Sequence, residues 1–176
     1  MEILTKTELT LRYDEIIAKI KQGAIFIYPT DTIYGIGCLA TNTASVQKIR
    51  TIKQRPTSPF SIWVPSIDWI NRNCILPTES TTALQNLPGP YTLILQLKNN
   101  KSISPLIHPN TNSIGIRLPN HWFHKTVEKL NAPIVTTSAN KHNEPFMTSI
   151  ENLDPDIAKQ IDFLIYEGQK EARPSK

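Results

Sequence analysis

The sequence has few of the residues that hold disulfide-rich or metal-bound domains together. Among its 176 residues only Cys38 and Cys74 are cysteines, and their separation is not a metal-ligand spacing. We therefore expect two buried or half-buried thiols, neither a disulfide framework nor a zinc site, and a reducing compartment. Three histidines, His121, His124 and His142, are not spaced like a metal cage either, so we expect them at the surface and predict no metal site built from side chains.

Long apolar runs are also missing. No run approaches the ~20 residues of a membrane span, and residues 1–6 lack a basic segment followed by an apolar one. We therefore expect a soluble, cytoplasmic protein that does not associate with membranes. No internal repeat or low-complexity tract is visible.

The length of the chain indicates the number of domains, and its net charge indicates the kinds of ligand it can bind. A chain of 176 residues suits a single domain, 1–176, that buries roughly two-thirds or more of the surface its unfolded form exposes. Lysine plus arginine less aspartate plus glutamate is 19 − 15 = +4, and the sequence pI is about 9.1. This mild excess is compatible with anionic ligands and, more weakly, with RNA.

Short apolar runs alternate with segments of helical periodicity. The apolar runs predict strands at residues 24–28, 35–40, 60–65, 91–97, 113–119, 133–137 and 161–166. Apolar residues 3.6 apart predict helices over 13–20, 42–53, 67–71, 78–85 and 120–130, with another near 154. Asn42 or Thr43 can cap the second helix and Asn120 the fifth, and the polar loop 99–112 should be exposed. The alternation predicts an α/β (α+β) fold with a mixed sheet flanked by helices.

A basic pair stands at the end of the second predicted helix. Lys53 and Arg55 lie two residues apart, just before Pro56, which tends to end a helix. Cations are favoured at any helix C-terminus, so a solvated helix end explains the pair. Two cations side by side are equally suited to hold a phosphate group.

The predicted strand 24–28 leads into a loop with hydroxyl groups and an aromatic ring. Thr30, Thr32 and Tyr34 lie in this loop, and open α/β sheets bind ligands at strand ends. A plain turn, with Asp31 and the threonines making local hydrogen bonds, is the other interpretation.

Two further segments carry polar groups where a ligand could lie. Arg117 stands inside an otherwise apolar strand, and an unpaired buried guanidinium is costly, so it reaches either solvent or a ligand anion. Ser138 and Asn140 follow the strand 133–137 and place a hydroxyl and a carboxamide in one loop.

Four segments, taken in order, resemble the Sua5/YrdC/YciO family. They are residues 28–37 (YPTDTIYGIG), 88–95 (PGPYTLIL), 116–119 (IRLP) and 137–140 (TSAN). The resemblance covers the chain from about residue 10 to 175. It implies a YrdC/RibB-like fold, a twisted mixed sheet flanked by helices with a concave ligand-binding face.

The resemblance also implies a reaction. Lys53, Arg55, Ser138 and Asn140 match the quartet of the members that resemble L-threonylcarbamoyladenylate synthases, whereas the YciO branch lacks an intact quartet. Such enzymes join L-threonine, hydrogencarbonate and ATP into threonylcarbamoyl-AMP and release pyrophosphate, with Mg²⁺ expected to bridge phosphate oxygens. Other tRNA-modification proteins transfer the threonylcarbamoyl group to adenosine 37 of tRNA.

The matching positions carry implied roles. Lys53 and Arg55 would contact phosphate and carbamate oxygens, and Ser138 and Asn140 the nucleotide or the acyl group. The implied substrate-binding residues are Thr30, Thr32, Tyr34, Arg117 and Thr137 around threonine and the neighbouring loop, with Ser113 and Ser175 near the nucleotide. Arg117 would neutralise the threonine carboxylate.

The chain departs from the family pattern in four places, one of which is His142-Asn143 in place of a frequent serine-glycine. Ser58 precedes Pro59-Phe60 where relatives carry a lysine, asparagine or histidine, and Trp63 stands where some have a histidine. Residues 173–176 resemble only the start of a proline-serine-threonine strand, so either the C-terminus is truncated or the site closes differently. A module of the same fold that binds double-stranded RNA or tRNA without chemistry is the alternative function.

Overall fold

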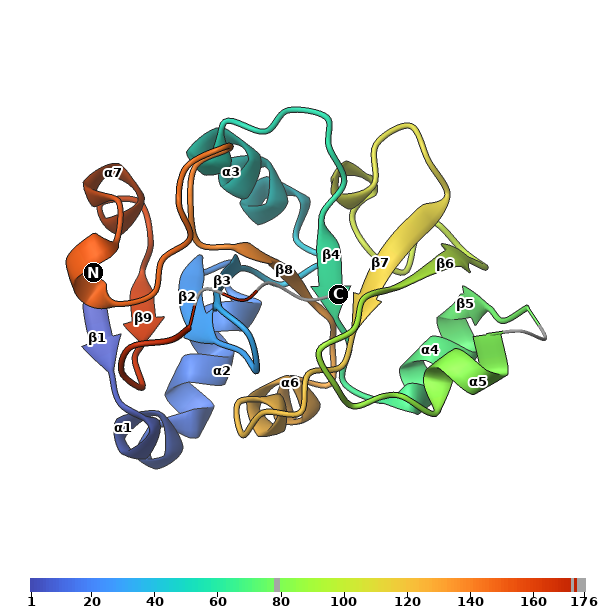
Figure 1. Cartoon of the computed structure of the whole chain (residues 1–176), viewed down its shortest axis with the longest axis horizontal. Coiled ribbons are helices and arrows are strands. Elements are labelled where there is room, and N and C mark those ends of the chain that lie inside the picture. Colours follow the sequence, from blue (N-terminus) through green and yellow to red (C-terminus); the bar gives the residue numbers. More distant parts are fainter. Residues whose placement is uncertain (78–79, 172, 174–176) are drawn as a thin grey trace.

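The computed structural model describes residues 1–77, 80–171 and 173. Its strands form one mixed sheet in the order β1-β9-β2-β3-β8-β4-β7-β6-β5, which runs from left to right in Figure 1. The strands are β1 Glu2–Leu4, β2 Phe26–Pro29, β3 Tyr34–Gly37, β4 Ser61–Trp63, β5 Cys74–Ile75, β6 Leu93–Leu97, β7 Ser113–Arg117, β8 Ile134–Ser138 and β9 Phe163–Ile165. The predicted α/β class with a mixed sheet is confirmed.

Helices flank this sheet. They are α1 Lys6–Leu11, α2 Tyr13–Lys21, α3 Thr43–Lys53, α4 Ile67–Asn73, α5 Ser80–Leu84, α6 His124–Leu130 and α7 Pro155–Ala158, with 3₁₀ turns η1 Pro105–Ile107 and η2 Ile150–Asn152. The helices predicted over 13–20 and 42–53 correspond to α2 and α3. β1 and α1 were not predicted, because three and six residues are too few to show a period.

Helix α3 begins and ends as its residues dictate. The side chain of Asn42 accepts a hydrogen bond from the Ser45 N–H at 3.0 Å, which confirms the predicted N-cap. At the other end Gln54 adopts a left-handed conformation, with φ 52° and ψ 41°. This left-handed residue ends the helix between Lys53 and Arg55.

Two sequence-based expectations about caps and loops were wrong. Asn120 does not cap α6, which begins at His124; the Asn120 N–H donates instead to Asp31 Oδ2 at 3.2 Å. The loop 99–112 is not simply exposed, because Ile103, Ile107 and His108 are buried beneath it. Those side chains fill the space beside α3, which contacts η1.

The histidines are also placed differently from the expectation. His142 is exposed as predicted, but His121 and His124 are only partly exposed. His121 Nε2 lies 3.0 Å from a Glu167 carboxylate oxygen, and His124 Nδ1 accepts a hydrogen bond from Trp63 Nε1 at 3.0 Å. Partners distant in sequence, which periodicity does not reveal, hold both rings.

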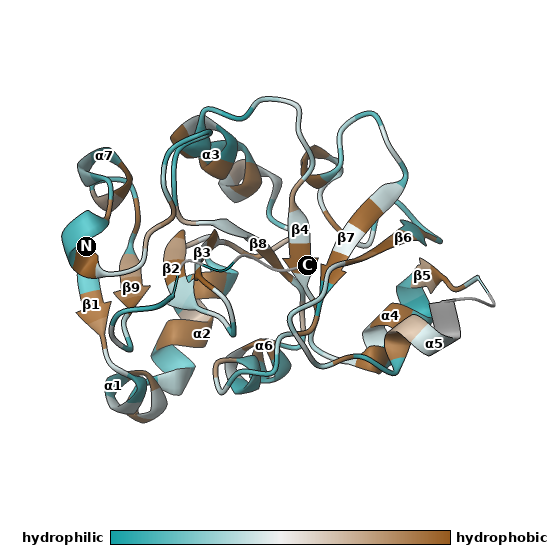
Figure 2. Cartoon of the chain, viewed as in Figure 1, coloured by the Kyte–Doolittle hydropathy of each residue, from teal (hydrophilic) through white to brown (hydrophobic). Residues whose placement is uncertain are grey.

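Two apolar clusters lie on opposite faces of the sheet. One contains Ile27, Ile36 and Ile62; the other contains Tyr28 and Trp63 and packs under α1, α2 and α6. Figure 2 shows the strands as the most apolar segments, with hydrophilic residues on the loops and outer helix faces. Cys38 and Cys74 are buried as expected. Among the described residues, no helix is long and apolar enough to span a membrane.

Candidate active site

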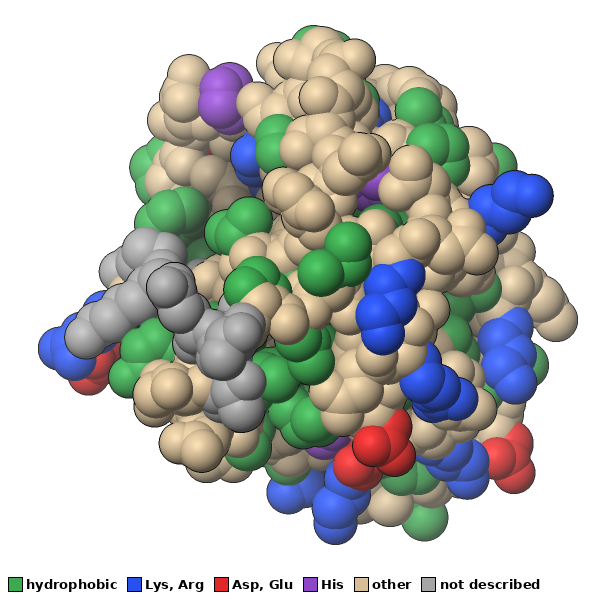
Figure 3. Space-filling model, turned by 90° about the vertical axis from the view of Figure 1, so that its right-hand side faces the viewer, with side chains coloured by type: hydrophobic (Ala, Val, Ile, Leu, Met, Phe, Trp, Pro, Cys, Tyr) green, Lys and Arg blue, Asp and Glu red, His purple; other side chains and the backbone are tan. Residues whose placement is uncertain are grey.

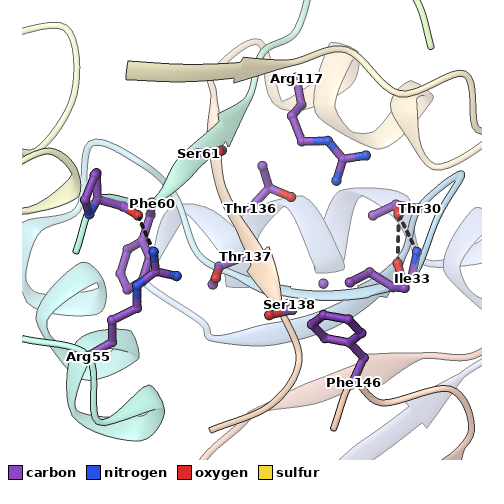
Figure 4. Close-up of a pocket in the computed structure, with 12 residues that line it drawn as sticks. Thr30, Ile33, Arg55, Phe60, Ser61, Arg117, Thr136, Thr137, Ser138 and Phe146 are labelled. Atoms are coloured by element: carbon purple, nitrogen blue, oxygen red, sulfur yellow. Dashed lines mark hydrogen bonds between the residues drawn. The ribbon is translucent and has the colours of Figure 1, made fainter. Parts of the chain in front are cut away.

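A cavity of ≈210 Å³ lies over the sheet, where β3, β4, β7 and β8 meet (Figure 4). Register explains which side chains reach it. Ser61 pairs with both Gly115 and Thr136, and Gly35 pairs with Ser138. Residues directly opposite each other, and those two apart along a strand, share a face of the sheet. The lining residues are Thr30, Ile33, Gly35, Arg55, Pro59, Phe60, Ser61, Arg117, Thr136, Thr137, Ser138 and Phe146.

The structure brings together five of the predicted site residues in this cavity. They are Thr30, Arg55, Arg117, Thr137 and Ser138, which come from four separate segments. Lys53 and Asn140 contact Ser138, and Thr32 contacts Arg117, but none of the three lines the cavity. Ser113 lies on β7, on the same face of the sheet as Arg117, and Tyr34 lies under the C-terminal segment. Ser175 lies outside the described residues.

Lys53 is held by the loop that follows β8. Its ammonium donates to Ser138 O at 2.6 Å, to Asn140 O at 2.7 Å and to Asn140 Oδ1 at 3.2 Å. An ammonium has three N–H donors, so these acceptors account for all of them. Lys53 is 2% exposed, and burial, together with the neighbouring Arg55 charge, lowers the pKa of Lys53 to about 7.

Arg55 points into the cavity from beyond the left-handed Gln54. Its Nη2 donates to Pro59 O at 3.0 Å and its guanidinium lies 5.6 Å from the Phe60 ring centroid. The buried Nε has no hydrogen-bond partner within the described part of the chain. Burial lowers the pKa of Arg55. A half-buried guanidinium that lines a cavity and has an unused donor is suited to hydrogen-bond an oxygen atom of a ligand.

Arg50 supports the same end of the cavity and was not predicted. It is 3% exposed, and its guanidinium donates to Arg55 O at 2.8 Å, to Ser58 O at 3.2 Å and to Leu106 O. We call Arg50, Lys53 and Arg55 the cation cluster. In residues 1–77, 80–171 and 173, no carboxylate forms a salt bridge with any of the three; their hydrogen-bond acceptors there are backbone carbonyl oxygens and the side-chain oxygen of Asn140.

The spacing of α3 could have revealed Arg50. Val46, Ile49, Arg50 and Lys53 follow the i, i+3, i+4, i+7 pattern of one helix face, and all four are buried. A basic residue on a buried helix face requires buried acceptors. The pattern of this helix face therefore indicates that Arg50 and Lys53 point into the protein rather than into solvent.

The Ser138–Asn140 loop is tightly fixed. Ser138 Oγ lies 2.5 Å from Asn140 Oδ1, and Asn140 Nδ2 donates to Glu144 O at 2.6 Å. Because Asn140 is 7% exposed and engaged on both sides of its carboxamide, it shapes the loop. Ser138 itself lines the cavity.

Arg117 lies at the other end of the cavity in Figure 4. Its Nη2 forms a salt bridge with Asp31 Oδ1 at 3.1 Å and lies 3.3 Å from Thr32 Oγ1. The residue is 7% exposed, and its Nε finds no hydrogen-bond partner among the described residues. Burial lowers the pKa of Arg117, and the Asp31 charge opposes that shift. Of the two interpretations of Arg117, the one in which it faces solvent is wrong.

Hydrogen bonds of its own threonine hydroxyls stabilise the Thr30–Tyr34 loop. Thr30 Oγ1 lies 3.0 Å from Thr32 Oγ1 and donates to Ile33 O at 2.7 Å. Tyr34 is fully buried, and its hydroxyl donates to Gly168 O at 2.7 Å. The segment after β9, which crosses in front of β2 and β3 in Figure 1, therefore covers the Tyr34 ring.

Several lining residues were not predicted. Ser61 and Thr136 could have been found from strand alternation once the register was known. Phe146 follows the Ser138–Asn140 loop, and no local pattern marks it. Trp63 is 0% exposed and packs in the aromatic cluster, as predicted, so it does not line the cavity.

Metal-binding groups do not gather at this site. Across the described ranges, no group of three or more His, Cys, Asp or Glu side chains could hold a metal ion. The cavity lining contains hydroxyls, arginines and apolar groups, but no carboxylate in the part of the chain that the structure describes. An ion here would depend on oxygen atoms of a ligand.

Known proteins share both the sequence and this architecture. Residues 18–176 match the Sua5/YciO/YrdC family model, which is described as telomere recombination. A threonylcarbamoyl-AMP synthase of Xanthomonas axonopodis pv. citri is 30% identical over 165 residues, which are 89% of this chain and 86% of that protein.

Solved structures agree. A H234A/Y235A variant of P. abyssi Sua5 superposes with a TM-score of 0.88 at 25% identity, covering 99% of this chain and 53% of that one. The chain thus spans about half of Sua5. E. coli YciO superposes with a TM-score of 0.84 at 19% identity, covering 99% of this chain and 86% of YciO. The family match, the synthase of similar length and the shared fold lead to one conclusion: the chain belongs to the Sua5/YciO/YrdC family.

Proposed function

We propose that this protein is an L-threonylcarbamoyladenylate synthase. It would make threonylcarbamoyl-AMP and pyrophosphate from L-threonine, hydrogencarbonate and ATP. The observation that carries the proposal is a single cavity with an uncompensated cation, Arg55, at one end and the buried Arg117 at the other (Figure 4). The relative of similar length that is named as such a synthase supports the same activity.

The cation cluster suits the triphosphate. In the proposed reaction the amine of threonine and hydrogencarbonate give an N-carboxythreonine and water. Its carboxylate oxygen then bonds to the α-phosphorus as the bond to the β-phosphate oxygen breaks, and pyrophosphate leaves. Negative charge grows on phosphate oxygens during this step, so Arg55 would stabilise the transition state through its planar fork.

The Arg117 end suits an amino acid. Arg117 lines the cavity, and the N–H groups that Asp31 does not engage can donate to a carboxylate oxygen. The Thr32 hydroxyl lies 3.3 Å from Arg117 Nη2, and the Thr30 hydroxyl lies 3.0 Å from that of Thr32. Ser113 lies four residues before Arg117 on β7, which is roughly 13 Å at 3.3 Å per residue. That separation leaves room for the phosphate and ribose of an adenylate between them, consistent with the implied role of Ser113 near the nucleotide.

Lys53 and Tyr34 would act indirectly. Lys53 fixes the loop that carries Ser138, and Tyr34 fixes the Thr30 loop against the C-terminal segment. Ser138 would then offer its hydroxyl to the nucleotide or the acyl group. In this proposal Arg55, rather than Lys53, is the cation that touches phosphate.

Mg²⁺ belongs to the proposal as a partner of ATP. Because no carboxylate lines the cavity within the described residues, phosphate oxygens and water would hold the ion, as is usual for Mg²⁺ in nucleotide sites. The ion would neutralise phosphate charge. The product would pass, in the cytoplasm, to proteins that transfer the threonylcarbamoyl group to adenosine 37 of tRNA.

The test is pyrophosphate release by the purified chain with each substrate omitted in turn. We expect release to require ATP, L-threonine and hydrogencarbonate, and Arg55→Ala to lower kcat/KM by about 10²- to 10³-fold, as when one transition-state donor is lost. Arg72→Ala is the matched control, because Arg72 is exposed on α4.

Binding to RNA without chemistry is the outcome that would contradict this proposal. Figure 3 shows several lysine and arginine side chains on the face that includes β5, β6 and α4, among acidic, neutral and hydrophobic side chains. RNA affinity that falls steeply with salt, together with no threonine-dependent pyrophosphate release, would establish the alternative.

A further inference from the structure

Asp31 joins two segments that are distant in sequence at the Arg117 end of the cavity. Its Oδ1 accepts from Arg117 Nη2 at 3.1 Å, and its Oδ2 accepts from the Asn120 N–H at 3.2 Å. The side chain is 11% exposed. One carboxylate therefore links the loop between β2 and β3 to the end of β7 and the residues that follow it.

This link fixes one nitrogen of the Arg117 guanidinium, which lines the cavity. Asp31 and Thr32 are the neighbours of Nη2, at 3.1 and 3.3 Å. The buried Nε lacks a partner in the described part of the chain. A guanidinium held by one nitrogen in a fixed direction leaves its remaining donors available in a fixed direction as well.

Burial makes this arrangement depend on Asp31. Arg117 and Asp31 side chains are 9% and 11% exposed, so solvent provides little alternative hydration. Removing one partner of a buried pair leaves the other charge uncompensated. Arg117 would then move toward other acceptors, and its unused donor would lose its direction.

We propose that Asp31 is a positioning residue that orients Arg117 to receive the carboxylate of the amino-acid substrate. The inference rests on the proposed function and adds a residue to it. Asp31 does not touch the substrate, because both of its oxygens are engaged by protein donors. Its role is to set the angle at which Arg117 meets a planar carboxylate.

The experiment compares Asp31→Asn with Asp14→Asn. Asn keeps the size of Asp31 but removes the charge that holds Arg117. We expect KM for L-threonine to rise about 10- to 100-fold, the range of a lost charged hydrogen bond, while KM for ATP stays within twofold. Asp14 is the matched control because its side chain is 94% exposed in an ion pair with Lys129; its variant should leave both constants unchanged.

A second variant keeps the inference testable if Asp31→Asn does not fold. Asp31→Glu retains the charge but moves the carboxylate one methylene farther out, so it cannot meet both Arg117 and Asn120 as Asp31 does. We expect a severalfold rise in KM for threonine, smaller than for Asn, with KM for ATP unchanged. Equal rises in both constants, or no rise in either variant, would overturn the inference. A wild-type chain without threonine-dependent pyrophosphate release would instead overturn the proposed function.

Discussion

Arg55 and Arg117 line opposite ends of one cavity, but their charges are compensated in different ways. Arg117 is paired with Asp31 at 3.1 Å. Arg55 stands beside Arg50 and Lys53, and within the described residues these three cations are solvated by carbonyl and amide oxygens alone. Each arginine nevertheless has a buried Nε that is left without a partner in the described chain.

The difference matches two kinds of anion. A cluster without carboxylates keeps its positive charge and favours a ligand with several negative charges, such as a triphosphate. A paired arginine carries little net charge but has a fixed direction, which favours a single carboxylate of defined position. The cation cluster thus leaves positive charge without a counter-ion at one end, while Asp31 keeps the other end oriented.

After the loss expected for Arg55→Ala, the largest effect is expected from removing the residue that supports the charged end. Lys53→Met keeps the length of the side chain but removes three hydrogen bonds to the Ser138–Asn140 loop. We expect kcat/KM for ATP to fall about 100-fold, because small displacements of a catalytic loop cost this much. Lys48→Met, an exposed lysine of the same helix, should change it little. An unchanged rate in Lys53→Met would show that the loop needs no ammonium.

The same residue predicts opposite pH trends for stability and activity. Because the pKa of Lys53 is lowered to about 7, the unfolded chain binds more protons than the folded chain between about pH 7 and 10. The free energy of unfolding should therefore rise with pH in this range, and Lys53→Met should lack that rise. The kcat/KM of the wild type should fall above about pH 7 as the ammonium loses a donor. Urea titrations and rates at matched pH measure both.

The next prediction concerns the stability of the left-handed residue Gln54, which lies between Lys53 and Arg55. Gln54 holds φ 52°, a conformation that costs a residue with a Cβ roughly 1–2 kcal/mol and a β-branched one more. Gln54→Val should destabilise the fold by about 1–2 kcal/mol beyond the cost of Gln47→Val at an exposed helical position of α3, whereas Gln54→Gly should be close to neutral. Equal losses for the two valine variants would mean that the left-handed turn carries no strain.

Sequence patterns predicted most elements but only part of the site. Asn42 and the apolar spacing of Val46, Ile49 and Ile52 define α3 locally, so the helix was predictable. Asp31 was not, because Arg117 is 86 positions away and no local signal connects them. Lys53 was predicted as a phosphate ligand, yet its ammonium is directed to backbone oxygens of the Ser138–Asn140 loop, and only tertiary packing brings these together.

The smallest effect on activity is expected for Glu167, which supports the Thr30 loop at the Arg117 end of the cavity only through Lys170. Glu167 accepts from His121 Nε2, Trp122 Nε1 and Lys170 Nζ, and Lys170 Nζ also donates to Thr30 O at 2.8 Å. Although burial opposes its ionisation, these hydrogen bonds lower the pKa of Glu167 to about 2.

Glu167→Gln should therefore reduce the free energy of unfolding by about 1–2 kcal/mol at pH 7. Since the pKa in the folded chain is depressed, this difference from the wild type should shrink as pH falls from about 5 to 2. The KM for threonine should rise no more than a few-fold, because Lys170 holds the Thr30 loop only from outside, and the KM for ATP should not change. The exposed Glu171→Gln is the matched control. If the KM for ATP rose instead, the two ends of the cavity would be mechanically coupled, and the separation between an oriented and a charged end would be wrong.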